Sequence, residues 1–230
     1  MQNLVVLSGA GMSAESGIPT FRDMGGIWEK YDLTTVASPD AWENNRELVL
    51  RFYNERRKKL FECHPNKGHK VVAQLEDYFN VTVVTQNVDD LHERAGSSNV
   101  LHLHGELKKA RSTVDPSLIY ELSSWELKTG DLCDKGSQLR PHIVWFGESV
   151  DNIYPAVDII RSADILIVAG TSLNVYPAAG LIDFASFNTP VYVIDPGHPK
   201  VDKSSNITVI QKSVTEGFAL LFDDLTGQNS

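Results

Sequence analysis

The 230-residue sequence has few cysteines, no long apolar run and no excess of positive charge, and each lack excludes a class of protein. Two cysteines, Cys63 and Cys133, are too few for a disulfide framework or a four-thiolate zinc site, so we expect a reducing, cytoplasmic location. No apolar stretch is long enough to span a membrane, and no signal-like segment precedes the first apolar run. A net charge of −9 argues against nucleic-acid binding, because no surplus of cations exists to neutralise phosphates. We therefore expect neither a membrane nor a nucleic acid as partner.

What the sequence does have is a series of short runs rich in Val and Ile, typical of strands buried on both faces. They cover residues 4–7, 81–85, 100–103, 164–170, 190–195 and 207–210. Apolar residues at helical spacing over 67–79 and 216–225 predict helices between some of them. Strands alternating with helices predict an α/β fold with a parallel, doubly wound sheet and ligands at the carboxyl ends of its strands.

Two segments interrupt this alternation. Residues 28–62 read as helices, whereas residues 106–140 are polar and irregular, with turn signals at Asp115-Pro116, Gly130 and Gly136. We expect the two insertions to form a smaller lobe on the sheet.

A glycine-rich turn, "SGAGMSAESGIPTFR" (8–22), follows the first predicted strand. Its glycines suit a close approach of the backbone to a pyrophosphate. The usual dinucleotide pattern is incomplete, because position 14 is Ala and no acidic residue ends a second strand roughly 20 residues on. The turn also lacks the Lys-Ser/Thr of a P-loop. A tight turn without a ligand is the alternative, and Arg22 favours a phosphate or a ribose.

Polar side chains follow three further strands. Gln86, Asn87 and Asp89 follow one, and helix capping is the alternative explanation for them. "VLHLHGEL" (100–107) ends another, with His102 and His104 on one face; each is either a structural histidine or a general base. "VAGTSLNVYPAAG" (168–180) supplies small hydroxyl residues suited to ribose or phosphate. Because four strand ends carry small or polar residues, one shared cleft is favoured over four separate helix caps.

These blocks resemble the sirtuin family of NAD-dependent protein deacylases. "GAGMSAESGIPTFR", "TQNVDDLHERAG", "LHGEL", "LRPHIVWFGE" and "GTSLNVYPAAG" occur in the family's order between residues 9 and 180. The resemblance implies one catalytic domain over residues 1–230, with an acyl-lysine peptide of a protein partner entering between two lobes. The large lobe would be a Rossmann-like, NAD-binding unit made of residues 1–27, 64–105 and 141–230. The small lobe would comprise residues 28–63 and 106–140.

The resemblance also implies a role for individual positions. His104 would be the general base, with Asn87 and Asp89 as further catalytic residues that orient the nicotinamide ribose. The residues that line the cofactor would be Gly9, Ala10, Gly11, Ala14, Phe21, Arg22, Trp28, Gln86, Asn87, Asp89, Gly170, Thr171, Ser172, Asp195, Pro196, Gly197 and Ser213. The residues that flank the acyl-lysine would be Ala37, Tyr53, Arg56, Val144, Trp145, Phe146, Gly147 and Val175.

The implied chemistry fits these residue types. The acyl oxygen would attack the ribose carbon as nicotinamide leaves, and Asn87 and Asp89 would stabilise the developing positive charge. His104 would then take a proton from a ribose hydroxyl. The products would be free lysine, nicotinamide and O-acyl-ADP-ribose, so that NAD is consumed.

The small lobe departs from the family pattern of two C-x-x-C pairs that hold zinc. Ser112 and Asp115 stand where the first pair would lie, and Cys133 and Gly136 where the second would lie. We predict no structural zinc. A weakened site recruiting Asp115, Cys133 and a histidine is the alternative. The lobe would then be held by packing, through Leu118, Ile119, Tyr120, Leu122 and Trp125.

Tyr53 and Arg56, at i and i+3 of a predicted helix, indicate the acyl preference. The sirtuin subgroup that removes succinyl and malonyl groups carries a Tyr-x-x-Arg pair here, together with an alanine at the position of Ala37. An arginine in an apolar tunnel gains most from a carboxylate. A solvated cationic helix face is the alternative. We therefore predict a desuccinylase and demalonylase with weaker deacetylase activity. A deacetylase without acidic preference, a mono-ADP-ribosyltransferase and a non-catalytic sensor are the competing functions.

Overall fold

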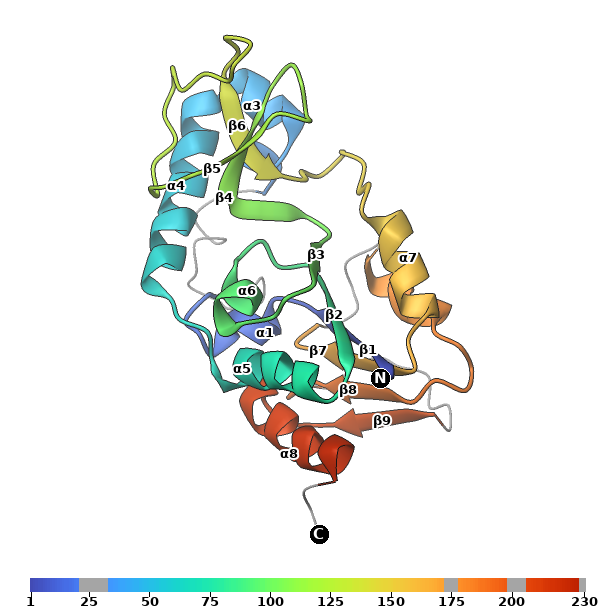
Figure 1. The fold of residues 1–230 in the computed structure, drawn as a ribbon. Coiled ribbons are helices and arrows are strands. Elements are labelled where there is room, and N and C mark those ends of the chain that lie inside the picture. The colour runs from blue at the N-terminus through green and yellow to red at the C-terminus, as the bar shows by residue number, and fades with distance from the viewer. Residues whose placement is uncertain (21–32, 172–177, 198–205, 228–230) are drawn as a thin grey trace.

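The computed structural model describes residues 1–20, 33–171, 178–197 and 206–227. Six strands form one sheet in the order β3-β2-β1-β7-β8-β9, and every neighbouring pair is parallel (Figure 1). The strands are β1 (Asn3–Ser8), β2 (Asn80–Thr85), β3 (Val100–His102), β7 (Ile165–Ala169), β8 (Val191–Ile194) and β9 (Ile207–Ile210). All six predicted strands, and the parallel α/β fold, are therefore confirmed.

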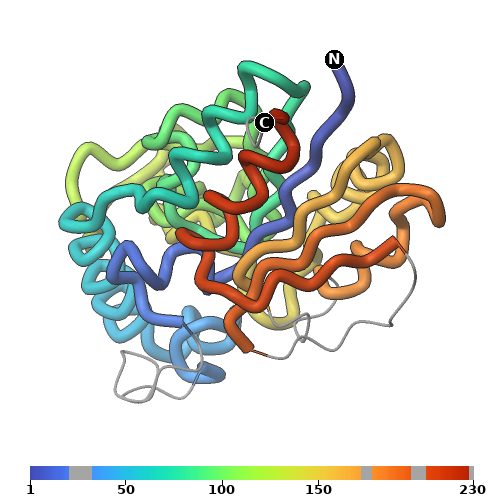
Figure 2. Tube along the Cα trace, turned by 90° about the horizontal axis from the view of Figure 1, so that it is seen from below, coloured from blue at the N-terminus to red at the C-terminus, as the bar shows by residue number. Residues whose placement is uncertain are grey.

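Helices cover both faces of this sheet. On one face α5 (Lys67–Gln74), the short η2 (Leu75–Asp77) and α8 (Val214–Thr226) pack on alternate strand residues such as Leu4 and Val6. On the other face α7 (Ile153–Arg161) and η3 (Ala178–Phe184) pack on the intervening residues, Val5 and Leu7. Figure 2 shows α5 and α8 on one side of the strands and α7 and η3 on the other. The near-continuous apolar runs of the strands are explained by this burial on both faces.

In the small lobe, helices of the first insertion pack against a second sheet, which the second insertion forms (Figure 1). Its helical part comprises η1 (Leu33–Thr35), α3 (Pro39–Asn44) and α4 (Arg46–Glu62). Its sheet is antiparallel, in the order β5-β4-β6, with β4 (Gly105–Ser112), β5 (Ile119–Glu121) and β6 (Leu139–Ile143). A separate apolar cluster that includes Val49, Phe52, Leu107 and Ile143 holds the two parts together.

This second sheet corrects the expectation that residues 106–140 are irregular. Its strands were missed because they are only partly buried, and the buried positions of β4 do not alternate regularly. Leu107 and Ala110 are both buried although they are three residues apart, because the register shifts between Gly105 and Ala110. The predicted packing was wrong at two positions: Ile119 is 45% exposed and Trp125 is 38% exposed. Leu118, Tyr120 and Leu122 do pack against the cluster, as expected.

Two short helices stand at the strand ends that face the small lobe. α1 (Gly11–Ala14) follows β1, and α6 (Leu91–Ala95) follows the segment after β2. β4 begins at Gly105, directly after His104. The φ angle of Gly105 is +81°, and a Cβ on this residue would overlap the carbonyl oxygen of His142. The chain therefore passes from the large sheet to the small one at a point that only glycine fits. The lobe boundaries given above stay a prediction.

Among the helices of the described residues, none is both long and apolar enough to cross a membrane.

Candidate active site

The site begins where the turn after β1 meets the end of β7. The Gly9 amide donates to the Ala169 carbonyl at 3.1 Å, and the Gly11 amide donates to the Gly170 carbonyl at 2.7 Å. A Cβ on Gly11 would lie 2.8 Å from the Cα of Gly170, closer than atoms pack, so the turn requires glycine here. Close packing of the backbone therefore explains these glycines, in addition to their predicted role at a pyrophosphate. Ala10 is partly exposed beside them, and Ala14 is exposed.

Ser13, on α1, links the two polar side chains predicted to orient the ribose. Its hydroxyl donates to Asp89 Oδ2 at 2.9 Å and accepts from Asn87 Nδ2 at 3.1 Å. The Asn87 amide donates to Thr85 Oγ1 at 3.0 Å, and Asp89 Oδ1 accepts from the Leu91 amide at 3.2 Å. All of these side chains are buried. The structure therefore brings Asn87 and Asp89 together in one fixed hydrogen-bond network.

Several opposing effects set the pKa of the buried Asp89 carboxyl. Burial is the largest of them and raises the pKa of Asp89 overall, although the Ser13 hydroxyl, the Leu91 amide and the charge of His102 oppose this shift. The charge of Asp89 also raises the pKa of the Arg56 guanidinium, although burial lowers that pKa overall. A carboxylate so placed supplies negative potential where a positively charged ribose carbon would develop.

The ring of His104 is held in one tautomer. Its Nδ1 lies 3.0 Å from the carbonyl oxygen of Gln86. A carbonyl can only accept, so Nδ1 carries the hydrogen and Nε2 keeps its lone pair. Burial lowers the pKa of His104, and the Gln86 carbonyl opposes this shift. The ring is therefore neutral at physiological pH and can accept a proton at Nε2.

The remaining described cofactor residues lie at the ends of β2, β7, β8 and β9. Gln86 Nε2 donates to Thr171 Oγ1 at 3.2 Å, which joins two of the predicted positions across β1. The Gly197 amide donates to Asp195 Oδ1 at 2.8 Å, beside the exposed Pro196. Ser213 caps α8, since its hydroxyl accepts from the Glu216 amide at 3.4 Å. Their roles at the cofactor stay predictions.

Five of the predicted residues lie outside the described part of the chain: Phe21, Arg22, Trp28, Ser172 and Val175.

The segment after β6 connects the site to the small lobe. The Val144 amide donates to the His104 carbonyl, and the Phe146 amide donates to the Ala37 carbonyl, both at 3.0 Å. Trp145 Nε1 donates to the hydroxyl of Tyr53 at 3.0 Å. Five predicted substrate residues are thereby joined to each other or to His104. Phe146 is 58% exposed and Gly147 has φ of +90°, so the turn presents a ring to solvent beside the site.

Glu148 holds this turn and was missed in the sequence. Its carboxylate accepts from the Trp145 amide at 2.8 Å and from Arg140 at 2.6 and 3.0 Å. The Arg140 guanidinium also stacks 3.3 Å from the centre of the Trp145 ring. The block "LRPHIVWFGE" contains both residues, but the spacing of Arg140 and Glu148 alone did not indicate that they pair.

Adjacent arginines on α4 point to different surroundings. Arg57 is fully buried, and its guanidinium donates to the carbonyls of Leu107 and Trp125 and to Asn54. Arg56 is partly exposed and lies over the rings of Phe52 and Tyr53, 5.5 and 5.8 Å from their centres. Burial raises the pKa of Tyr53 to about 12, and the nearby Arg56 opposes this. Arg57 therefore has a structural role, whereas Arg56 lies over the Tyr53 ring and interacts electrostatically with Asp89.

The residues at the expected zinc position do not fit the metal. The Ser112 hydroxyl accepts from the amides of Val114 and Asp115, both at 3.2 Å, and its hydrogen bond to the Cys133 thiol lowers the pKa of that thiol. The Asp115 carboxylate is engaged by Ser117 and, at 2.8 Å, by Lys135, so that its pKa falls to about 2. Gly136 offers no side chain. One thiol with engaged oxygen neighbours is a poor donor set for zinc, which supports the prediction of no structural zinc.

Comparisons with known proteins bear on this site. The pattern that defines the Sir2 family matches residues 9–177. An NAD-dependent protein deacylase of Bacteroides thetaiotaomicron is 54% identical over 222 residues, covering 94% of this chain and 95% of the relative. One of Helicobacter pylori is 52% identical over 227 residues, covering 98% of each chain. A solved complex of a Sir2 homolog with NAD superposes with a TM-score of 0.89 at 39% identity, covering 99% of this chain and 91% of that one.

Proposed function

The chain belongs to the Sir2 family, and from this premise we propose that it removes succinyl and malonyl groups, and acetyl groups more weakly, from lysine side chains. It is an NAD-dependent protein deacylase, and NAD is its cosubstrate. Its partners are acylated proteins or peptides, and the products are free lysine, nicotinamide and O-acyl-ADP-ribose. The finer preference depends on Tyr53 and Arg56.

The network around Ser13 supports the proposed roles at the ribose. The protein itself holds Asn87 and Asp89 in place, because each makes a hydrogen bond with the same buried hydroxyl. A preorganised carboxylate and amide stabilise positive charge on the ribose carbon without reorganising as nicotinamide leaves. This arrangement makes direct water attack on the amide unnecessary.

The tautomer of His104 is the observation that carries the proton-transfer step. With its hydrogen committed to the Gln86 carbonyl, the ring has a free lone pair on Nε2. It takes a proton from a ribose hydroxyl, so that the hydroxyl oxygen can attack the acyl carbon. The lowered pKa keeps this base unprotonated at neutral pH.

The surroundings of Arg56 support the preference for an acidic acyl group. Burial lowers the pKa of this guanidinium, so an added carboxylate stabilises the charged form that burial disfavours. The Tyr53 hydroxyl already accepts a hydrogen bond from Trp145, which leaves its own hydrogen to donate to a ligand. The partly buried guanidinium and this hydroxyl together form a site for the terminal carboxylate of a succinyl or malonyl group.

The test is to exchange Arg56→Met and to compare succinyl-lysine and acetyl-lysine peptides. Loss of a charged hydrogen bond should lower kcat/KM for the succinyl peptide about ten- to a hundredfold, because such bonds contribute roughly 1.5–3 kcal/mol. The acetyl peptide should change much less. The measurement is mass spectrometry of each peptide with and without NAD.

Arg51→Met is the matched control, since Arg51 is an exposed arginine of the same helix, and it should leave both activities intact. His104→Tyr should abolish both. Equal losses for the two peptides in Arg56→Met would contradict the acyl assignment and favour a deacetylase without acidic preference. Stable ADP-ribose on a protein, without O-acyl-ADP-ribose, would favour ADP-ribosyl transfer.

A further inference from the structure

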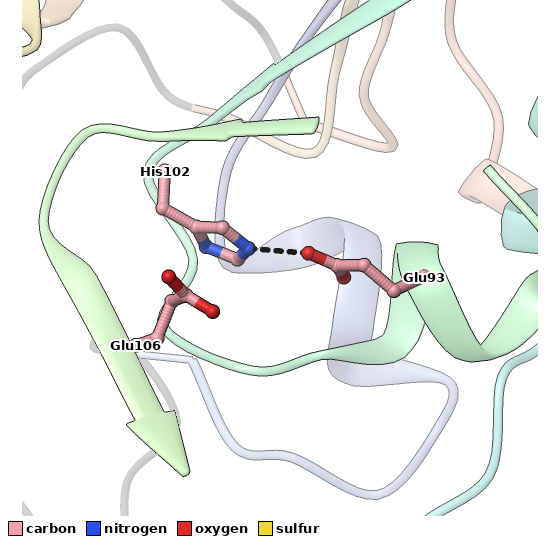
Figure 3. A group of neighbouring side chains, drawn as sticks. All are labelled: Glu93, His102 and Glu106. Carbon is pink, nitrogen blue, oxygen red and sulfur yellow. Dashed lines mark hydrogen bonds and ion pairs between the residues drawn. The ribbon is translucent and has the colours of Figure 1, made fainter. Parts of the chain in front are cut away.

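His102 ends β3 two residues before His104, and nothing in the reaction described so far uses it. It is 7% exposed. Its Nδ1 lies 2.8 Å from the backbone carbonyl oxygen of Asn87, and its Nε2 lies 2.7 Å from Glu93 Oε1 on α6 (Figure 3). His102 and His104 therefore contact consecutive carbonyls, those of Asn87 and Gln86, from the same segment.

The two partners of His102 fix its protonation. The Asn87 carbonyl only accepts, so Nδ1 carries a hydrogen, and the ionised Glu93 carboxylate also only accepts, so Nε2 carries one as well. The ring is an imidazolium that forms an ion pair with Glu93. The pKa shifts agree: the net pKa of His102 is raised, because Glu93 and the Asn87 carbonyl outweigh burial, and the pKa of Glu93 is lowered despite burial.

Other titratable groups on the neighbouring elements influence the His102 ring or are influenced by its charge. Glu106 on β4 lies beside it in Figure 3 and is itself paired with Lys109 at 2.7 Å. Its charge, like that of Glu93, raises the pKa of His102. His92 on α6 is neutral, since burial lowers its pKa well below the ordinary value and the charge of His102 lowers it further. The pKa of the buried Asp89 is raised by burial, and the charge of His102 opposes this shift.

We propose that the His102–Glu93 ion pair is a positioning device for the 86–89 segment. Through Nδ1 it fixes the backbone carbonyl of Asn87, and the contact of Nε2 with Glu93 holds the ring in that orientation. His102 acts through Asn87 and touches no substrate. The inference rests on the proposed roles of Asn87 and Asp89 at the ribose.

Two isosteric variants separate the two contacts of the ring. In His102→Asn the amide nitrogen stands where Nδ1 stood, so the bond to the Asn87 carbonyl is kept. In His102→Gln the amide nitrogen stands where Nε2 stood, so the Glu93 contact is kept and the Asn87 carbonyl is left without its donor. We expect His102→Gln to lower kcat about tenfold and His102→Asn to retain kcat within about threefold, because an unsatisfied buried carbonyl carries the larger penalty.

Glu93→Gln tests the charge separately. Its amide can donate to Nε2, so the ring becomes neutral while Nδ1 still donates to Asn87. Glu93→Gln should therefore retain kcat within about threefold, because the donor to the Asn87 carbonyl is unchanged. Circular dichroism confirms that each variant is folded, and acetyl-lysine peptide is the common substrate.

Equal kcat values for His102→Asn and His102→Gln, or a loss of kcat in Glu93→Gln as large as that in His102→Gln, would overturn the proposal. Zn²⁺ binding by the wild-type chain that Glu106→Gln abolishes would also overturn it. Glu93, His102 and Glu106 have ligand atoms within 4.8 Å of one another, and a metal would then take the place of the proton. If the wild-type chain releases no nicotinamide from NAD, it is the proposed function that fails.

Discussion

At the scale of single residues, Ser13 connects the site most closely, although it is one of its smallest side chains. Its hydroxyl bonds to the side-chain amide of Asn87 and the carboxylate of Asp89, which both belong to the segment after β2. The hydroxyl has one hydrogen, which Asp89 receives, so Asn87 must be the donor to Ser13. This fixes the side-chain amide orientation of Asn87, with its oxygen directed away from Ser13.

Ser13→Ala should weaken the use of NAD. The substitution leaves Asp89 Oδ2 and Asn87 Nδ2 without this partner, so kcat/KM for NAD should fall about tenfold or more. The pKa of Asp89 should rise as well, because the Ser13 hydroxyl lowers it. Initial rates against NAD concentration measure the effect. Ser149→Ala, which removes a hydroxyl that donates to the exposed Asp151, is the control, and equal rates in both variants would contradict the network.

Much of the site was predictable at this scale because its residues follow recognisable strands. Gln86, Asn87, Asp89 and His104 all stand just after apolar runs, and the structure brings them together. Ser13 was missed because a serine among glycines and alanines reads as a turn residue. His102 was noticed but not used, since its partner Glu93 comes from a different element and no sequence spacing shows the contact.

At the scale of elements, α5 begins with a capping box that contains a titratable residue. The Asn66 side chain accepts from the His69 amide at 3.2 Å, and His69 Nδ1 accepts from the Asn66 amide at 3.3 Å. His69 is fully buried, and burial lowers its pKa to about 4. A proton on Nδ1 would break the cap, so the helix start requires the neutral ring.

His69→Gln should flatten the dependence of stability on pH. As pH falls from 6.5 towards 4, the unfolded chain binds a proton that the native His69 does not, so the native state loses about 3 kcal/mol. Glutamine keeps the capping box without titrating. Urea unfolding at pH 7.5 and pH 5 measures the change. His92 still contributes a slope of the same sign, so a reduced slope is expected. An unchanged slope would contradict the assignment.

The elements differed in how far the sequence could predict them. Val and Ile runs identified the strands of the parallel sheet, because both faces are buried there. β5 has three residues, and two of them, Ile119 and Glu121, are exposed, so it carries no such signal. Its pairing with β4 depends on contacts made after the chain turns at Asp115, where local pattern predicts only a turn.

At the scale of the whole molecule, the small lobe holds together through its apolar cluster and through pairs such as Lys135–Asp115 at 2.8 Å. α4 spans this lobe with one face buried, including Phe52, Tyr53 and Leu60. The lobe therefore has sources of stability other than a metal.

Treatment with EDTA should leave the midpoint of thermal unfolding unchanged, because the residues at the expected zinc position are engaged with each other. Differential scanning calorimetry, with a ZnCl₂-supplemented sample beside the chelated one, is the measurement. A lower midpoint after chelation that zinc restores would show that the lobe does hold a metal.

Gly105 ties the position of the proposed base to the strand that crosses beside it. Because the carbonyl of residue 142 fills the space where a Cβ would lie, any larger residue at position 105 would displace the backbone that follows His104. The direction of the histidine ring thus depends on its neighbour having no side chain.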